Sequence, residues 1–172
     1  MSATLRPAVS DPTRLAEVDA IACLVRDTPS SEESSLDRLT CLAAELLEAP
    51  VSVLTLVEAD RQFFASSHGL PEPLRSTRHT PLDYSLCQHV VAEGAPVIVC
   101  DAPRDVRVSR NRAVVEFGVR AYVGMPIFSL SHRTLGALSV LDYVPRDWTH
   151  DKLALLGDLS VAASHELGLG EP

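Results

Sequence analysis

The chain has few aromatic residues and no long hydrophobic run. Phe, Trp and Tyr make up 5% of the 172 residues, so the core must be built mainly from aliphatic side chains. The longest apolar run near the N-terminus, Ala20 to Val25, is shorter than the roughly 7–15 residues of a signal-peptide core. No apolar stretch approaches the roughly 18 residues that span a membrane. These absences predict a cytoplasmic globular protein with no membrane partner.

Positive charge is also scarce. The chain has 15 Lys and Arg residues against 23 Asp and Glu residues, which gives a formal net charge of −8. A surface this acidic repels nucleic-acid phosphates and anionic lipid, so we expect no nucleic-acid partner. Lys152 is the only lysine, and this preference for arginine, together with abundant alanine, indicates a GC-rich, bacterial genome.

The common motifs of catalysis and cofactor binding are missing. The sequence contains no GxGxxG, GxxxxGK[ST] or GxSxG motif. The histidines lack HxxxH or HExxH spacing, so we expect no metal site, although a haem would need only one axial histidine. The cysteines form no CxxC and are expected to be mostly buried thiols. No cofactor is therefore identified, and its identity stays unknown.

Hydrophobic spacing predicts three long helices. Asp11-Pro12 is typical of a helix start, and apolar residues then recur every three or four positions up to Val25. The same spacing returns over residues 35–49 and, after the helix-capping Thr149, over residues 150–167. The polar segment 28–35 is expected to link the first two helices.

The remaining segments predict strands and short helices. We expect strands at 51–59, 62–67, 97–100, 120–129 and 134–142, short helices at 83–93 and 113–117, and a loop at 68–80. Pro126 inside a strand indicates a sheet edge or a bulge. The order predicts an α/β (α+β) fold with a central antiparallel sheet of five to six strands. Long terminal helices would cover one face, and short helices and loops would form a pocket on the other.

Three segments resemble the GAF domain family, the small-molecule sensory module of signalling proteins. Residues 83–91 (DYSLCQHVV) are similar to the family's Ser-Phe-Cys-x-His stretch. Residues 96–105 (PVIVCDAPRD) are similar to its strand ending in Asp-Ala-x-x-Asp. Residues 119–126 (VRAYVGMP), followed by Leu135-Gly136-Ala137-Leu138 and Leu141-Asp142, resemble its Tyr-x-Gly-x-Pro, Gly-x-Leu and Leu-Asp pattern. The resemblance implies a GAF-like sensory domain at 34–168, which leaves the N-terminal helix and polar linker at 1–33 and a tail at 169–172.

The sequence also departs from the best-defined ligand-binding members of that family. Asn111 does not begin the Asn-Lys…Phe…Asp-Glu signature of cyclic-nucleotide binders, because Arg112 follows it and no Asp-Glu follows Phe117. Gln88 separates the Cys and His that are adjacent in most bilin binders. The resemblance therefore implies an unidentified small molecule as ligand.

The pocket is expected between the sheet and the segments 83–91 and 101–117, away from the long helices. The candidate ligand-binding residues are Asp83, Cys87, Arg107, Phe117 and Tyr122. Cys87 lies on the apolar side of its helix and is either a pocket thiol or a packing residue. Arg107 belongs to an arginine-rich loop, which is either a lid over an anionic ligand or a solvated loop. No residue is assigned a catalytic role.

The leading hypothesis is a non-enzymatic sensory or regulatory domain that signals through its terminal helices to a partner protein. The enzyme alternative is a thiol-dependent reductase of a small sulfoxide or peroxide, which would use Cys87 or Cys100 at a lowered thiol pKa. A third reading is a dimerisation scaffold without a pocket. Each of the three long helices carries an apolar seam, a row of apolar residues three or four positions apart. These seams predict a homodimer through the terminal helices, unless the first helix folds back on its own domain.

Overall fold

The structure, a computed structural model, describes residues 6–27 and 34–169. The strands are β1 (Val51–Val57), β2 (Arg61–His68), β3 (His79–Pro81), β4 (Val97–Val99), β5 (Ala121–Phe128) and β6 (Thr134–Asp142). The helices are α1 (Arg6–Val9), α2 (Pro12–Asp27), α3 (Ser35–Leu47), α4 (Leu74–Thr77), α5 (Cys87–Glu93), α6 (Arg112–Phe117) and α7 (His150–Glu166). Two 3₁₀ turns, η1 (Leu82–Tyr84) and η2 (Ala102–Arg104), complete the described elements.

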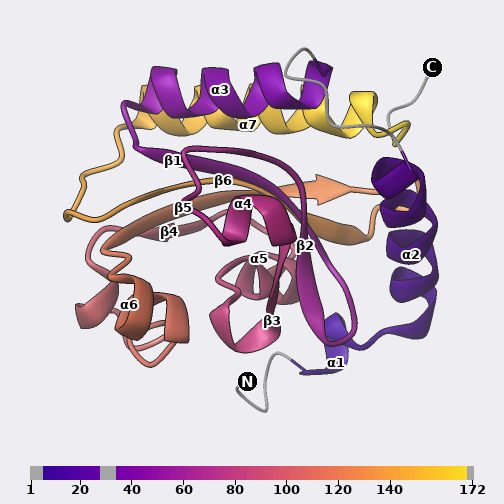
Figure 1. Cartoon of the computed structure of the whole chain (residues 1–172), viewed down its shortest axis with the longest axis horizontal. Coiled ribbons are helices and arrows are strands. Elements are labelled where there is room, and N and C mark those ends of the chain that lie inside the picture. Colours follow the sequence, from indigo (N-terminus) through magenta and orange to yellow (C-terminus); the bar gives the residue numbers. More distant parts are fainter. Residues whose placement is uncertain (1–5, 28–33, 170–172) are drawn as a thin grey trace.

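The strands form one antiparallel sheet in the order β3-β2-β1-β6-β5-β4. Helices α3 and α7 lie side by side on one face of this sheet, while α4, α5 and α6 lie on the other side (Figure 1). This arrangement confirms the expected α+β fold. The long helices begin at side-chain caps, since Ser34 and Thr149 accept hydrogen bonds from backbone N–H groups in the first turns of α3 and α7.

Helix α2 folds back against the end of the sheet (Figure 1). Val18 and Ala22 are fully buried in the same core cluster as the residues under α3 and α7. Arg14, also buried, donates hydrogen bonds to the carbonyl oxygens of Val57 and Leu135, where β1 ends and β6 begins. The alternative that the first helix packs on its own domain is therefore confirmed. The argument that its apolar seam needs a second chain is wrong.

Other expectations need correction. The cysteines are not mostly buried, since Cys87 is buried whereas Cys23 and Cys100 are exposed. The segment 68–80 is not only a loop, because it contains α4 and two of the three residues of β3. Both elements are too short to produce a periodic pattern. The helix expected at 83–93 is broken into η1 and α5, and the Gln88 side chain holds the break by donating from Nε2 to the carbonyls of Leu82 and Ser85. Part of the expected linker, 28–33, and the tail residues 170–172 lie outside the described residues.

Pro126 lies at a local edge of the sheet. Strand β4 pairs with β5 only from Tyr122 to Gly124. On that side of β5, Pro126 is therefore beyond the end of the neighbouring strand, so its missing N–H breaks no ladder hydrogen bond there. On the other side it pairs with Ala137 of β6. Strand β5 is an inner strand, so Pro126 is not on an edge strand; it is open only on the β4 side, and the bulge in the pairing with β6 falls one residue later, between Ile127 and Phe128.

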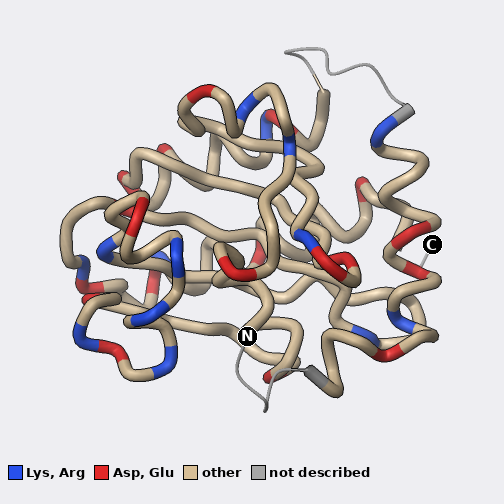
Figure 2. The backbone as a smooth tube through the Cα atoms, turned by 60° about the horizontal axis from the view of Figure 1, so that its bottom comes forward, with Lys and Arg blue, Asp and Glu red and all other residues tan. Residues whose placement is uncertain are grey.

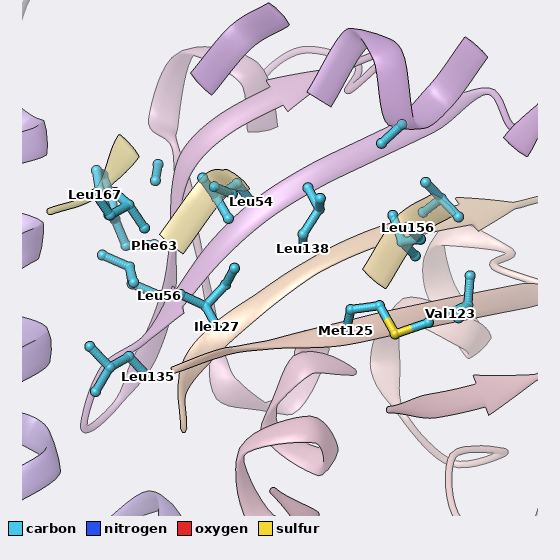
Figure 3. Packing of buried hydrophobic residues seen from close by; sticks show 14 of the residues in the cluster. Leu54, Leu56, Phe63, Val123, Met125, Ile127, Leu135, Leu138, Leu156 and Leu167 are labelled. Carbon is cyan, nitrogen blue, oxygen red and sulfur yellow. The ribbon is translucent and has the colours of Figure 1, made fainter. Parts of the chain in front are cut away.

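The two faces of the sheet are packed differently. Under α3 and α7, one continuous cluster joins the sheet to the helices, and Figure 3 shows Leu138 and Met125 of the sheet near Leu156 of α7. On the opposite face the buried residues fall into two clusters. One surrounds α5, and a small one contains Val51, Val53 and Phe64.

Candidate functional site

A cavity of about 360 Å³ lies between these two clusters. Its lining residues are Val53, Gln62, Phe64, Leu70, Pro71, Glu72, Pro73, Leu74, Thr80, Tyr84, Leu86, Cys87, Ala113, Phe117, Val119, Tyr122, Ser139, Leu141 and Tyr143. The volume falls within the roughly 300–1,000 Å³ typical of small-molecule sites. The cavity lies on the face expected from the sequence, away from α3 and α7.

Three polar side chains that contact one another, Tyr122, Cys87 and Ser139, form one part of the cavity wall. The Tyr122 hydroxyl donates a hydrogen bond to Sγ of Cys87 over 3.3 Å, and the Ser139 hydroxyl lies 3.7 Å from the same sulfur. Burial raises the pKa of the Cys87 thiol and raises the pKa of Tyr122 well above its usual value. Both groups are therefore neutral at physiological pH.

Gly124 determines how Tyr122 is placed in this wall. The two residues are on the same face of β5, and a Cβ atom at position 124 would lie 2.1 Å from the Tyr122 hydroxyl oxygen. Only glycine leaves room for the ring to lie along the strand and reach Cys87. The Tyr-x-Gly part of the sequence pattern thus has a packing reason at the cavity.

A second polar position involves Gln62 of β2 and Thr80 of β3. Gln62 Nε2 donates to the Thr80 hydroxyl over 2.8 Å. Gln62 Oε1 is buried and has no hydrogen-bond partner among the described residues. Such unpaired buried acceptors are uncommon in folded proteins and need an explanation.

Aromatic and charged side chains of α6 and η1 pack together beside the cavity. The rings of Tyr84 and Phe117 stack with centroids 4.9 Å apart, and the Arg112 guanidinium lies 4.4 Å above the Tyr84 ring. Glu116 pairs with Arg112 at 2.6 Å and accepts a hydrogen bond from the Tyr84 hydroxyl. The positive charge of Arg112, which stacks on the Tyr84 ring of the cavity wall, is therefore already paired with the carboxylate of Glu116.

The candidate residues are only partly brought together. Cys87, Phe117 and Tyr122 line the cavity. Arg107 does not, because its guanidinium pairs with Asp105 at 2.7 Å and donates to the carbonyl of Ile98. Asp83 is also outside the lining. Contact of these residues with a ligand stays a prediction.

The arginine-rich loop is partly neutralised by its own carboxylates. Asp101 pairs with Arg104 and Arg120, and Asp105 pairs with Arg107. Figure 2 shows basic and acidic residues interspersed over the described part of the chain, side by side in several loops. These pairs favour a solvated loop over a lid for an anionic ligand.

Sequence reasoning missed the lining residues on β2 and β3. In β2, Phe63 and Ala65 face the core under α3, whereas Gln62 and Phe64 line the cavity. The period of two along a strand carries this signal. It assigns Gln62 to the cavity face only once the face covered by the long helices is known.

Within residues 6–27 and 34–169, no three His, Cys, Asp or Glu side chains are placed to hold a metal ion. No helix in the same residues is long and apolar enough to span a membrane.

Comparison with known proteins agrees with the fold. The family model of the GAF domain matches residues 31–167. This chain belongs to the GAF domain family. A cyclic di-GMP phosphodiesterase of Pseudomonas aeruginosa is 27% identical over 135 residues, which are 78% of this GAF chain and 22% of that protein. The chain therefore spans about a fifth of that relative's length.

Solved structures show the same GAF fold. The GAF domain of an Acinetobacter phosphoenolpyruvate-protein phosphotransferase is 18% identical, with a TM-score of 0.65 over 92% of this chain and 94% of that chain. A free methionine-R-sulfoxide reductase from Neisseria meningitidis, solved with its substrate, is also 18% identical, with a TM-score of 0.63 over 88% and 86% of the two chains. At these identities the likeness establishes the fold alone.

Proposed function

We propose that this GAF domain is a non-enzymatic sensory module of a cytoplasmic signalling pathway. A small molecule binds in the cavity, and the bound state is read by a partner protein through the terminal helices. The observation that carries the proposal is the preformed, mostly apolar cavity on the face of the sheet opposite α3 and α7. The related phosphodiesterase, a signalling enzyme by its name, supports the signalling context.

The sheet offers a physical connection between cavity and helices. Tyr122 lines the cavity, while its neighbour Val123 packs in the cluster under α7. Ser139 and Val140 of β6 divide between the two faces in the same way. A ligand that shifts Tyr122 or Ser139 therefore moves strands on which α7 rests. A ligand with different affinities for two such packings shifts their populations.

The thiols do not favour the reductase alternative. The attacking species in thiol catalysis is the thiolate, and active cysteines have a lowered pKa. Burial raises the pKa of Cys87, which is the opposite direction. Cys100 is exposed and outside the cavity lining, so it is not placed to resolve an intermediate formed inside the cavity on Cys87.

Native mass spectrometry tests the proposal directly. We expect the purified protein to carry or take up a small molecule that denaturation releases. Ala113→Phe, which places a ring in the cavity from α6, should abolish this uptake while circular dichroism stays unchanged. Val106→Phe, on a fully exposed loop position, is the matched control.

Two outcomes would overturn the proposal. Thiol-dependent turnover of a sulfoxide or peroxide that is lost in Cys87→Ser or Cys100→Ser would establish an enzyme. Uptake that is identical in wild type and Ala113→Phe would place the ligand outside this cavity.

A further inference from the structure

We infer that the cavity binds an uncharged, hydrophobic molecule about the size of two fused rings and selects against anions and cations of the same size. This inference rests on the proposed function of the same cavity and names the chemical class of its ligand. It follows from the charges, the hydrogen-bond donors and the apolar surface of the wall.

The wall offers no opposite charge to an anionic ligand. Among the described residues, no Lys, Arg or His side chain lines the cavity. Arg112 is not part of the lining; it stacks on the outside of the Tyr84 ring and pairs with Glu116 at 2.6 Å. An anion that entered the cavity would therefore lose hydration without gaining an ion pair, which is costly.

Side chains already cap the two short helices that border the cavity. The first turn of a helix can hold an anion through backbone N–H groups that have no partner within the helix. In α5, the Gln88 N–H donates to the Ser85 hydroxyl over 3.2 Å. In α6, the Ala113 N–H donates to the Asn111 side chain over 2.8 Å. These caps occupy backbone donors that an anionic ligand would otherwise use.

A cationic ligand is disfavoured for a similar reason. Glu72 is the one acidic residue of the described lining, and its side chain is 56% exposed. Its carboxylate pairs with Arg75 at 3.3 Å and accepts hydrogen bonds from the backbone N–H and the hydroxyl of Ser76. This charge is therefore in contact with water and already paired, so it does not offset the desolvation of a cation inside the cavity.

The rest of the wall suits apolar surface. Phe64, Leu86 and Val119 line the cavity as buried residues, and the exposed lining residues Phe117 and Tyr143 are aromatic as well. The cavity, at about 360 Å³, is more than twice the roughly 150 Å³ known to hold one benzene ring. Two fused rings therefore fit, and burial of their apolar surface supplies the binding free energy.

Three probes with the same two rings separate charge from size. Naphthylmethanol is neutral, naphthoate is an anion and naphthylmethylammonium is a cation, all substituted at the same ring position. Calorimetry and the shift in melting temperature measure their binding to the full chain. We expect the alcohol to bind at least roughly tenfold tighter than either ion. A long-range effect of the net charge of −8 would instead favour the ammonium over the alcohol.

A cation placed in the lining should change this preference. Tyr143→Arg, at a lining residue that is 44% exposed, should tighten naphthoate binding roughly threefold to fivefold relative to the alcohol, the effect of an exposed ion pair. Val144→Arg is the matched control, because it adds the same charge at an exposed residue outside the lining, and it should leave the ratio unchanged. Phe117→Arg replaces Tyr143→Arg if that variant fails to fold, and if neither folds the affinity ratios of the wild type decide.

The outcomes distinguish the ligand class from the proposed function. Binding of either ion to the wild type as tightly as the alcohol overturns the ligand class and leaves the cavity as a binding site. An unchanged ratio in Tyr143→Arg, or an equal change in Val144→Arg, does the same. So does uptake of another molecule in native mass spectrometry by a protein that binds none of the probes. A protein that binds no probe and takes up no other small molecule overturns the proposed function itself.

Discussion

Gly124, Gly136 and Gly157 differ in what surrounds their Cα atoms. A Cβ atom at Gly136 would lie 1.8 Å from the carbonyl oxygen of Thr55, because β6 and β1 approach closely there. At Gly124 the obstacle is the Tyr122 hydroxyl. At Gly157, in the middle of α7, nothing lies within 4 Å. The same substitution therefore has different consequences at each site.

We expect Gly136→Ala to lower the free energy of unfolding by about 3 kcal/mol, at the upper end for overpacking, since the backbone of β1 must move. Gly124→Ala should cost roughly 1–3 kcal/mol and displace Tyr122 from Cys87. Gly157→Ala, the control, should raise stability by up to about 1 kcal/mol, because alanine favours the helix. Urea unfolding measures all three, and a stable Gly136→Ala variant would contradict the packing described.

His89 on α5 gives the domain a pH dependence. Burial lowers the pKa of His89, and the nearby charges of Glu93 and Asp105 oppose this effect while Arg107 adds to it. The unfolded chain therefore binds the proton more tightly than the folded one. Stability that is present above about pH 6.5 is lost as the pH falls toward the folded-state pKa.

Replacement of His89 by Phe should remove this contribution. We expect the unfolding free energy of the wild type to fall below about pH 6.5 with a slope no steeper than about 1.4 kcal/mol per pH unit, the value for one proton. His89→Phe should flatten the curve, and His150→Gln, at an exposed position of α7, should not. Parallel curves for wild type and His89→Phe would show that another group is responsible.

At the scale of elements, Arg14 joins α1 and α2 to the sheet. Its guanidinium donates to the carbonyls of Val9, the last residue of α1, of Val57, the last residue of β1, and of Leu135, the second residue of β6. Burial lowers the pKa of Arg14 to about 10, so the side chain remains charged at neutral pH. Helix α1 in turn packs against α5, whose Cys87 lines the cavity.

Arg14→Met should destabilise the domain by roughly 2–4 kcal/mol, because it removes the donor from three carbonyl groups while keeping a similar apolar length. The same change at Arg38, an exposed arginine of α3, should be near neutral. Hydrogen exchange should show the loss of protection at α1 and α2 first. Equal protection in wild type and Arg14→Met would mean that apolar packing alone holds these helices.

The sequence predicts the long elements of this fold better than the short ones. The helices α2, α3 and α7 and the strands of the two hairpins carry enough residues for a clear period, and they appear at the expected places. Elements of three or four residues, such as β3 and α4, carry no period. In the site, Cys87 and Tyr122 follow from their position in the resemblance. The period of two puts Gln62 and Phe64 on one face of β2, but which face holds the cavity depends on tertiary packing, as does the local pairing of Arg107.

At the scale of the whole molecule, stability and binding are separated by the sheet. The face under α3 and α7 is filled by one continuous cluster, whereas the opposite face leaves a cavity between two smaller ones. An unfilled core costs stability, since the walls lose contacts and apolar burial. The packed face under α3 and α7 can stabilise the fold, while the opposite face of the sheet keeps its cavity available to a ligand.

We propose that the expected homodimer forms through the outer surface of α3 and α7. Helix α2 is not proposed as the interface, because its apolar side packs on its own domain. Leu42 and Leu46 of α3 and Leu155 of α7 are 43%, 43% and 40% exposed. Helix α7 begins where α3 ends, as the pairing of Lys152 with Glu48 shows, so Leu46 and Leu155 are near the same end of the pair. Two such pairs related by a two-fold axis would form a four-helix bundle.

Leu46→Glu should convert a dimer into a monomer, because it places a charge in the apolar contact while leaving the domain's own core intact. Sedimentation at tens of micromolar protein measures this change, a concentration range in which even a weak dimer is populated. Val106→Glu, in an exposed loop far from α3 and α7, should sediment like the wild type. A wild type that is monomeric at this concentration would contradict the dimer. A dimer that survives Leu46→Glu would move the interface to another surface, since a buried, unpaired carboxylate at its centre is not tolerated.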